Sequence, residues 1–181
     1  PIENIVLSTR KNFSNSIRQM AAFNTENSEV DPSSYMIEDY YLRRVLSSEL
    51  NRNAKIQVIN STEVIQDDTN SFETKIMLSD KSFIRTEILI ISDGRESAFA
   101  KRLDKSFFKK SYNQVAIVGN LSHKNEHKFV AHQLFLSGGP LAILPLRGKR
   151  STFVWSLPLE MGKKLNKSED EIFINYLREH V

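Results

Sequence analysis

The most pronounced feature of the hydrophobic pattern is a short apolar run at residues 88–91, which ends at Asp93 and Gly94. Such a run, closed by a turn signal, is typical of a strand that is buried on both faces. Beyond the turn, Phe99 and Leu103 are four residues apart, as on one face of a helix. The pattern therefore predicts a strand, a tight turn and a helix. Asp93 would then lie where open α/β sheets bind their ligands.

A purely structural interpretation of this turn is equally simple. Asp-Gly pairs commonly follow strands, because Gly accepts a positive φ and Asp can bond to its own backbone. On spacing alone, both interpretations stay open.

The remaining pattern predicts a helix over 35–53, a second helix over 168–181 and three groups of strands. The expected strands are 2–7 and 20–23, then 56–59, 63–65, 72–78 and 83–84, then 114–121, 128–136, 141–146 and 152–157. Residues 67–70 are turn-formers, and Ser168 with Glu171 has the spacing of a capping box. Consecutive strands with short connections should pair antiparallel, and Pro145 should lie at a sheet edge or a bulge. Trp155 is expected in the core.

Composition narrows the class of protein. The chain has 181 residues, of which 40% are hydrophobic and 26% are charged, as in ordinary globular proteins. The absence of cysteine excludes disulfides and thiolate metal sites. A net charge of +3 does not indicate nucleic-acid binding. His123 and His127 have no third ligand at a convincing spacing, so no metal site is expected.

Lys and Arg gather at residues 101–110, where Asp104 is the single acidic residue. A charge run of this kind is usually a solvated face. The alternative is attraction to anionic lipid headgroups, which contribute about 1 kcal/mol per basic residue near a membrane surface.

Two motifs carry a resemblance to a known family. Residues 90–97, with the sequence Ile-Ile-Ser-Asp-Gly-Arg-Glu-Ser, resemble the Asp-Gly motif of flavin-dependent aromatic hydroxylases. Residues 139–146 and 151–155, preceded by Tyr112, Gln114 and Ala116, resemble the ubiquinone-biosynthesis branch, which includes 2-polyprenyl-6-methoxyphenol hydroxylase. The similarity runs in order along most of the chain, and the second motif is the more specific.

The resemblance implies a hydroxybenzoate-hydroxylase-like fold of mixed α/β and α+β class. Residues 1–34 would form a crossover segment, 35–105 part of the FAD-binding domain, and 106–181 the antiparallel sheet and C-terminal helix of the substrate domain. A G-x-G-x-x-G fingerprint is missing, and so is the family's later Gly-Asp segment. With Pro1 in place of a starting Met, this predicts a central fragment that binds FAD weakly or not at all on its own.

The resemblance also implies site residues. Asp93, Gly94 and Ser97 would border FAD, and Glu38 and Arg43 would contact it from the first helix. Helix capping for Glu38 and a solvated charge for Arg43 are the alternatives. No side chain is expected to act as a catalytic acid or base.

Leu144, Leu146, Thr152 and Val154 would line the ring pocket of the substrate. Residues 141–146 and 152–157 contain no charged side chain. Because a carboxylate buried without a cation is costly, the resemblance implies a neutral, apolar phenol as the substrate. The structural alternative is that these residues are simply core.

The expected function is therefore FAD-dependent hydroxylation of a polyprenylated phenol in ubiquinone biosynthesis, with NAD(P)H or another electron donor. We expect a cytoplasmic location, peripheral contact with the inner membrane and contacts with other ubiquinone-biosynthesis proteins. The alternatives are a non-catalytic relative that binds lipid or a partner, and a flavin oxidoreductase of the same fold with another apolar substrate, such as a halogenase.

Overall fold

The computed structural model describes residues 1–10, 16–24, 32, 34–70, 72–94, 97–102 and 110–180. The chain forms two compact units, one made of residues 1–44 with 111–181 and one of residues 45–110. We call them the sheet unit and the inserted unit. The expected domain boundaries at 34/35 and 105/106 stay a prediction.

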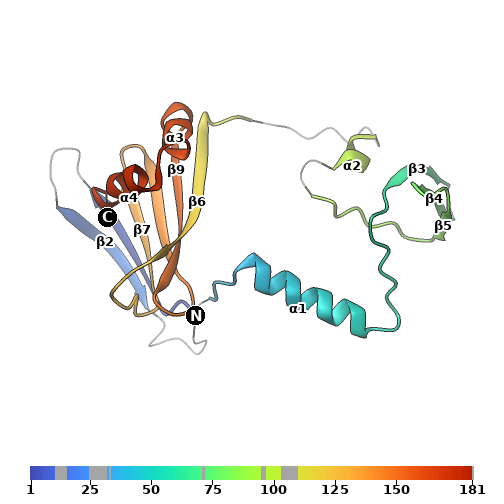
Figure 1. Ribbon diagram of the computed structural model, residues 1–181, viewed down its shortest axis with the longest axis horizontal. Coiled ribbons are helices and arrows are strands. Elements are labelled where there is room, and N and C mark those ends of the chain that lie inside the picture. Colours follow the sequence, from blue (N-terminus) through green and yellow to red (C-terminus); the bar gives the residue numbers. More distant parts are fainter. Residues whose placement is uncertain are drawn as a thin grey trace. The chain divides into compact units, whose positions relative to one another are not determined.

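The sheet unit is built on a six-stranded sheet with the order β2-β1-β7-β8-β9-β6 (Figure 1). Its strands are β1 (Asn4–Arg10), β2 (Ile17–Asn24), β6 (Gln114–Ser122), β7 (Val130–Leu136), β8 (Gly139–Pro145) and β9 (Arg150–Pro158). All neighbours are antiparallel except β1 and β7, which run parallel. The strands expected in this part of the chain are confirmed.

The pairing differs from the expectation in two respects. The consecutive strands β6 and β7 do not pair, because β6 instead pairs with β9 at the edge of the sheet. The connection 123–129 has seven residues, which is enough to cross three strand spacings, or about 14 Å. Pro145 is the last residue of β8 and pairs with Ser151, so it lies at a strand end rather than at a sheet edge or a bulge.

One face of the sheet carries the core. The helices α3 (Leu159–Asn166) and α4 (Asp170–Arg178) pack on it, and Trp155 stacks on Tyr176 at 5.5 Å between ring centroids. The buried cluster is Leu134, Leu141, Phe153, Trp155, Leu157, Leu165 and Leu177. The expected core position of Trp155 and the C-terminal helix are confirmed. The capping box is wrong, because the Ser168 hydroxyl donates to the Leu165 carbonyl oxygen at 2.7 Å.

Strand alternation places a second set of side chains on the opposite side of the sheet, which we call the open face. Thr152 and Val154 alternate with the buried Phe153 and Trp155 along β9. Across the ladder, Thr152 pairs with Leu144. Because side chains at alternate strand positions point to opposite faces, these three positions face away from α3 and α4.

The inserted unit contains a three-stranded meander of β3 (Val64–Thr69), β4 (Thr74–Leu78) and β5 (Phe83–Thr86). The meander is confirmed, but residues 56–59 form no strand and the expected turn at 67–70 lies mostly within β3. The short helix α2 (Ala98–Arg102) follows the Asp-Gly turn and buries Phe99. Arg102 donates hydrogen bonds to the carbonyl oxygens of Ile65 (2.6 Å) and Val64 (2.7 Å), which joins α2 to β3.

The predicted buried strand at 88–91 is wrong. These residues form no strand, and Ile88 and Ile90 are 75% and 81% exposed. A strand is stable only when its backbone groups pair with a neighbour, and within the described residues no strand pairs with this segment.

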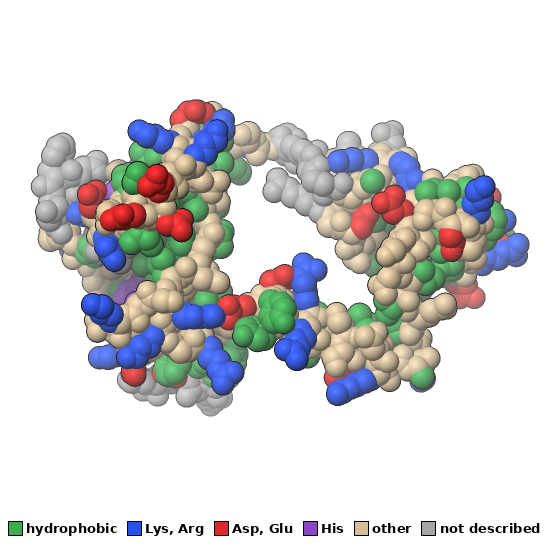
Figure 2. Space-filling view, in the orientation of Figure 1, with side chains coloured by type: hydrophobic (Ala, Val, Ile, Leu, Met, Phe, Trp, Pro, Cys, Tyr) green, Lys and Arg blue, Asp and Glu red, His purple; other side chains and the backbone are tan. Residues whose placement is uncertain are grey.

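The helix α1 (Asp39–Arg52) confirms the helix expected at 35–53, although it begins four residues later. It has no buried residue. Apolar side chains along it therefore lie at the surface, as Figure 2 shows. The residues of the predicted hydrophobic stripe do form a helix, but none of them is buried against another described element.

Candidate functional site

Three of the four predicted substrate residues share the open face. Leu144 and Thr152 are directly paired across β8 and β9, and Val154 follows Thr152 by two residues on the same side. All three are partly exposed. Leu146 follows the end of β8 and is buried, with an exposed fraction of 7%.

The open face is almost free of charge across its four central and edge strands. The side chains that alternation places there, from β6 to β9, are those of Gln114, Ala116, Val118, Asn120, Ser122, Ala131, Gln133, Phe135, Pro140, Ala142, Leu144, Arg150, Thr152, Val154, Ser156 and Pro158. Arg150 is the single charged residue among these positions. The face is therefore uncharged apart from its end at Arg150.

Thr152 brings a polar atom to this surface. Its hydroxyl donates a hydrogen bond to the Gly119 carbonyl oxygen at 3.0 Å. A hydroxyl has one proton to donate and two lone pairs, so the Thr152 oxygen retains the capacity to accept a hydrogen bond from a ligand.

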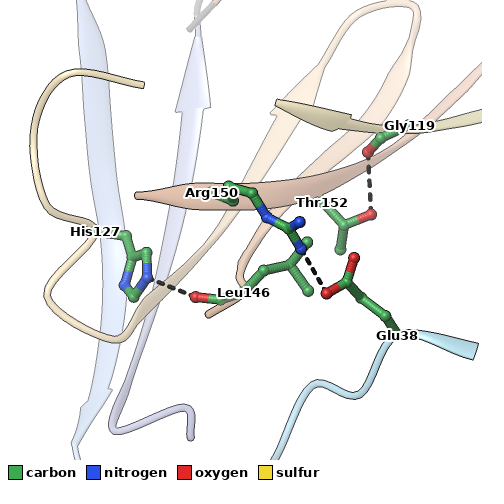
Figure 3. A network of polar contacts seen from close by, with 6 residues as sticks. All are labelled: Glu38, Gly119, His127, Leu146, Arg150 and Thr152. Atoms are coloured by element: carbon green, nitrogen blue, oxygen red, sulfur yellow. Dashed lines mark hydrogen bonds and ion pairs between the residues drawn. The ribbon is translucent and has the colours of Figure 1, made fainter. Parts of the chain in front are cut away.

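The charge of Arg150 is balanced at the end of the face. Figure 3 shows its guanidinium directed to the carboxylate of Glu38. Arg150 Nη2 lies 2.5 Å from Glu38 Oε2. Sequence reasoning missed this pair. Strand alternation could have placed Arg150 beside Thr152, but no sequence signal connects it to Glu38, which is 112 residues away.

Two histidines fasten the loop between β6 and β7 to the hairpin of β8 and β9. The Phe129 backbone N–H donates to His127 Nδ1 at 3.0 Å, so Nε2 carries the proton and donates to the Leu146 carbonyl oxygen at 2.8 Å. His123 Nε2 lies 3.0 Å from the Ser151 hydroxyl. These bonds define the loop that borders Leu146 and Arg150.

A separate pocket of about 780 Å³ lies within the inserted unit. Its walls are formed by residues 62–65 and 89–93, together with Ala98, Phe99 and Arg102. Asp93 belongs to this lining. The lining therefore combines apolar side chains with two carboxylates, Glu63 and Asp93, and the guanidinium of Arg102.

Asp93, Gly94 and Ser97 lie close together just before α2. Gly94 has a φ of +91°, and no atom lies within 4 Å of the place where a Cβ would stand. The Ser97 N–H donates to the Gly94 carbonyl oxygen at 3.2 Å. The open space over Gly94 allows a ligand to approach the backbone closely, which fits a cofactor border.

The other two cofactor candidates, Glu38 and Arg43, belong to the sheet unit. Glu38 binds Arg150, and Arg43 pairs at 2.5 Å with Asp39 one turn away on the exposed surface of α1. The contact of all five residues with a cofactor stays a prediction. Within the described residues, no helix is long and apolar enough to span a lipid bilayer.

Comparison with known proteins places this geometry in context. No protein-family model matches the chain. It is 30% identical over 125 residues to the ubiquinone hydroxylase UbiL of Rhodospirillum rubrum, an alignment that covers 69% of the chain and 29% of that protein. It is 36% identical over 109 residues to the mitochondrial ubiquinone biosynthesis monooxygenase COQ6 of Schizosaccharomyces pombe, covering 60% of the chain and 23% of the relative. The chain is a relative of ubiquinone-biosynthesis monooxygenases.

Solved structures agree on the fold of this relative of ubiquinone-biosynthesis monooxygenases. PqsL of Pseudomonas aeruginosa, described as a probable FAD-dependent monooxygenase, superposes with a TM-score of 0.79 at 18% identity, covering 98% of the chain and 48% of PqsL. HpxO of Klebsiella pneumoniae, solved with FAD, gives a TM-score of 0.68 at 16% identity over 88% of the chain and 41% of HpxO. The expected hydroxybenzoate-hydroxylase-like fold and the family resemblance are confirmed. The chain spans less than a third of the length of the curated relatives it matches.

Proposed function

We propose that the chain is part of an FAD-dependent monooxygenase that hydroxylates a neutral, polyprenylated phenol in ubiquinone biosynthesis. The observation that carries this proposal is the open face, where Leu144, Thr152 and Val154 form an uncharged surface. Its support from relatives is the similarity to ubiquinone-biosynthesis monooxygenases.

The chemistry of the face favours a neutral ring. Burial of apolar ligand surface stabilises binding by about 25 cal/mol per Å². A phenol hydroxyl can donate to the Thr152 oxygen, whose own proton is bound to Gly119. An ionised group over Leu144 or Val154 would lose its hydration without gaining a partner there.

The cofactor would be bordered by Asp93, Gly94 and Ser97, with Glu38 and Arg43 as further contacts. The open space at Gly94 supports this placement, because a flat or phosphorylated group can approach the backbone there. Bound FAD would supply the oxygen-activating redox chemistry. The electrons would come from NAD(P)H or another donor.

Contact with the inner membrane follows from the substrate, since a polyprenyl tail partitions into lipid. The basic run at 101–110 is a candidate contact, and its residues 103–109 lie outside the described part of the chain. We propose a cytoplasmic enzyme that is peripheral to the membrane and works beside other proteins of the pathway. Co-sedimentation with liposomes tests the contact, and equal binding to neutral and anionic liposomes would remove the basic run from it.

The full-length gene product provides the decisive experiment. Purified protein should retain FAD and should form a hydroxylated product from a prenylated phenol only in the presence of oxygen and reductant. Val154→Asp should raise the KM for the phenol by about tenfold or more, because the new carboxylate must be desolvated by the ring. FAD content should not change.

Val58→Asp is the matched control, since Val58 is 45% exposed and belongs to the inserted unit, not to a strand of the open face. It should leave the KM unaltered. A full-length protein that retains no FAD, or that turns over no phenol, would contradict the proposed function.

A further inference from the structure

Arg150 is the exception on the otherwise uncharged open face. It stands at the start of β9, two residues before Thr152, and pairs across the ladder with Ser122. Its side chain is only 40% exposed. A guanidinium in this place is close enough to the ring-binding surface to attract the acidic group of a ligand.

Glu38 removes that attraction. Its carboxylate, which is 22% exposed, receives a hydrogen bond from Arg150 at 2.5 Å. Arg150 Nε is buried and has no hydrogen-bond partner among the described residues. The guanidinium therefore has an anionic partner at Nη2, whereas its Nε is buried and out of reach of a ligand.

We propose that Glu38 sets the charge preference of the open face by masking Arg150. This inference rests on the proposed function for the nature of the ligand, a phenol. With Glu38 in place, the face accepts a neutral ring and rejects a ring that carries a carboxylate. Without Glu38, Arg150 becomes a binding site for that carboxylate.

The physical reason is an exchange of equivalent partners. A ligand carboxylate can reach Arg150 only by displacing the Glu38 carboxylate, so one ion pair replaces another and a displaced, partly buried anion remains nearby. No affinity is gained. When residue 38 is uncharged, the same ligand carboxylate forms a new charge-assisted bond with an arginine that is already positioned.

Glu38 is thus a positioning and specificity residue rather than a catalytic one. It directly precedes α1, so the pair also fixes the start of that helix against β9. A purely structural role would change the binding of all ligands alike. A masking role changes the preference between charged and neutral ligands.

The test uses full-length protein and two probes that differ by one carboxylate group, phenol and 4-hydroxybenzoate, with affinities measured by isothermal titration calorimetry. Glu38→Gln should tighten 4-hydroxybenzoate by about tenfold or more, as expected for a hydrogen bond to a charged group. The ratio of the affinity for 4-hydroxybenzoate to the affinity for phenol should rise by a similar factor, whatever change the substitution makes to both affinities alike. Glu38→Ala is a second variant with the same expected direction.

Two further variants test whether the gain in affinity depends on Arg150. In the double variant Glu38→Gln with Arg150→Gln, the gain for 4-hydroxybenzoate should disappear. Glu160→Gln is the matched control, because it removes a carboxylate from an exposed pair with Lys163 on α3. It should change neither affinity.

The proposal is overturned if Glu38→Gln and Glu38→Ala bind 4-hydroxybenzoate no better than the unaltered protein, or if the gain survives the loss of Arg150. Failure of the proposed function has a different signature, since the unaltered protein would then bind neither FAD nor phenol. The carboxylate gain in the variants is judged independently of that result.

Discussion

The two units of this protein treat similar apolar residues in opposite ways. In the sheet unit, Leu141 and Trp155 are 0% and 1% exposed, whereas in the inserted unit Ile88 and Ile90 are 75% and 81% exposed. Both pairs belong to segments whose sequence predicts a strand. The comparison shows that a hydrophobic pattern alone does not determine burial. Burial also requires a neighbouring element against which the apolar side chains can pack.

The partners of the sheet unit are encoded close by. Strands β7, β8 and β9 follow one another through short turns, and α3 and α4 come directly afterwards to cover the sheet. The segment 88–91 has no comparable neighbour among the described residues. The relative UbiL is more than three times as long as the part aligned with this chain, so its fold contains elements beyond those described here.

The largest difference is expected when one apolar side chain is shortened to alanine in each unit. Leu141→Ala should lower the free energy of unfolding of the sheet unit by about 3–5 kcal/mol, because Leu141 is fully buried. Ile90→Ala should change stability by less than about 0.5 kcal/mol. Urea unfolding followed by Trp155 fluorescence and circular dichroism measures both, and equal losses would remove the contrast between the units.

Two glycines with positive φ sharpen the same contrast. A Cβ at Gly139 would stand 2.2 Å from the backbone oxygen of Ser156, whereas a Cβ at Gly94 would meet no atom within 4 Å. We expect Gly139→Ala to destabilise the sheet unit by about 2–4 kcal/mol through strain and overlap. Gly94→Ala should cost about 1 kcal/mol from backbone strain alone. Thermal unfolding would contradict this if the order were reversed.

A polar contact supports the inserted unit where apolar burial is poor. Arg102→Ala removes two hydrogen bonds to β3 and the packing of the guanidinium at 4.9 Å from the Phe99 ring centroid. The expected local loss is about 1–3 kcal/mol, seen as faster hydrogen exchange in β3 and α2. Arg52→Ala, which breaks an exposed pair with Glu49, is the control and should leave exchange in β3 unchanged.

The smallest effect concerns pH and the sheet unit. Burial lowers the pKa of His132, so the native state binds its proton less readily than the unfolded chain. The stability contribution is therefore fully present above about pH 6.5 and is lost as the pH falls through the lower native pKa. Because part of the ring is exposed, the loss should stay below about 1 kcal/mol. His132→Gln should flatten the unfolding profile between pH 7 and 5, and an unchanged slope would exclude His132 as its source.

The fold of the sheet unit was largely predictable from sequence. Alternation in β9 marks Phe153, Trp155 and Leu157 as one face and Thr152 and Val154 as the other, and the Gly138-Gly139 turn marks the hairpin of β7 and β8. The order of strands was not predictable, because the pairing of β6 with β9 and of β1 with β7 depends on contacts between distant segments. The short helix α3 was also missed.

The candidate site shows the same division. The uncharged character of Leu144, Thr152 and Val154 is visible in the sequence, and so is the Asp93-Gly94 turn. The ion pair of Glu38 with Arg150 is not, because long-range ion pairs leave no periodic signal. The prediction of a strand at 88–91 is wrong for the opposite reason. The local hydrophobic signal is strong, but no strand among the described residues pairs with this segment.

The parallel pairing of β1 with β7 has a consequence for how the protein forms during synthesis. Asn4 pairs with Val130 in this ladder. Strand β1 can therefore complete its hydrogen bonds only after well over a hundred further residues have been synthesised. Until then β1 offers unpaired backbone groups to any neighbouring chain, and contacts of such long sequence separation are slow to close. The ladder between β1 and β7 is therefore expected to form late in folding.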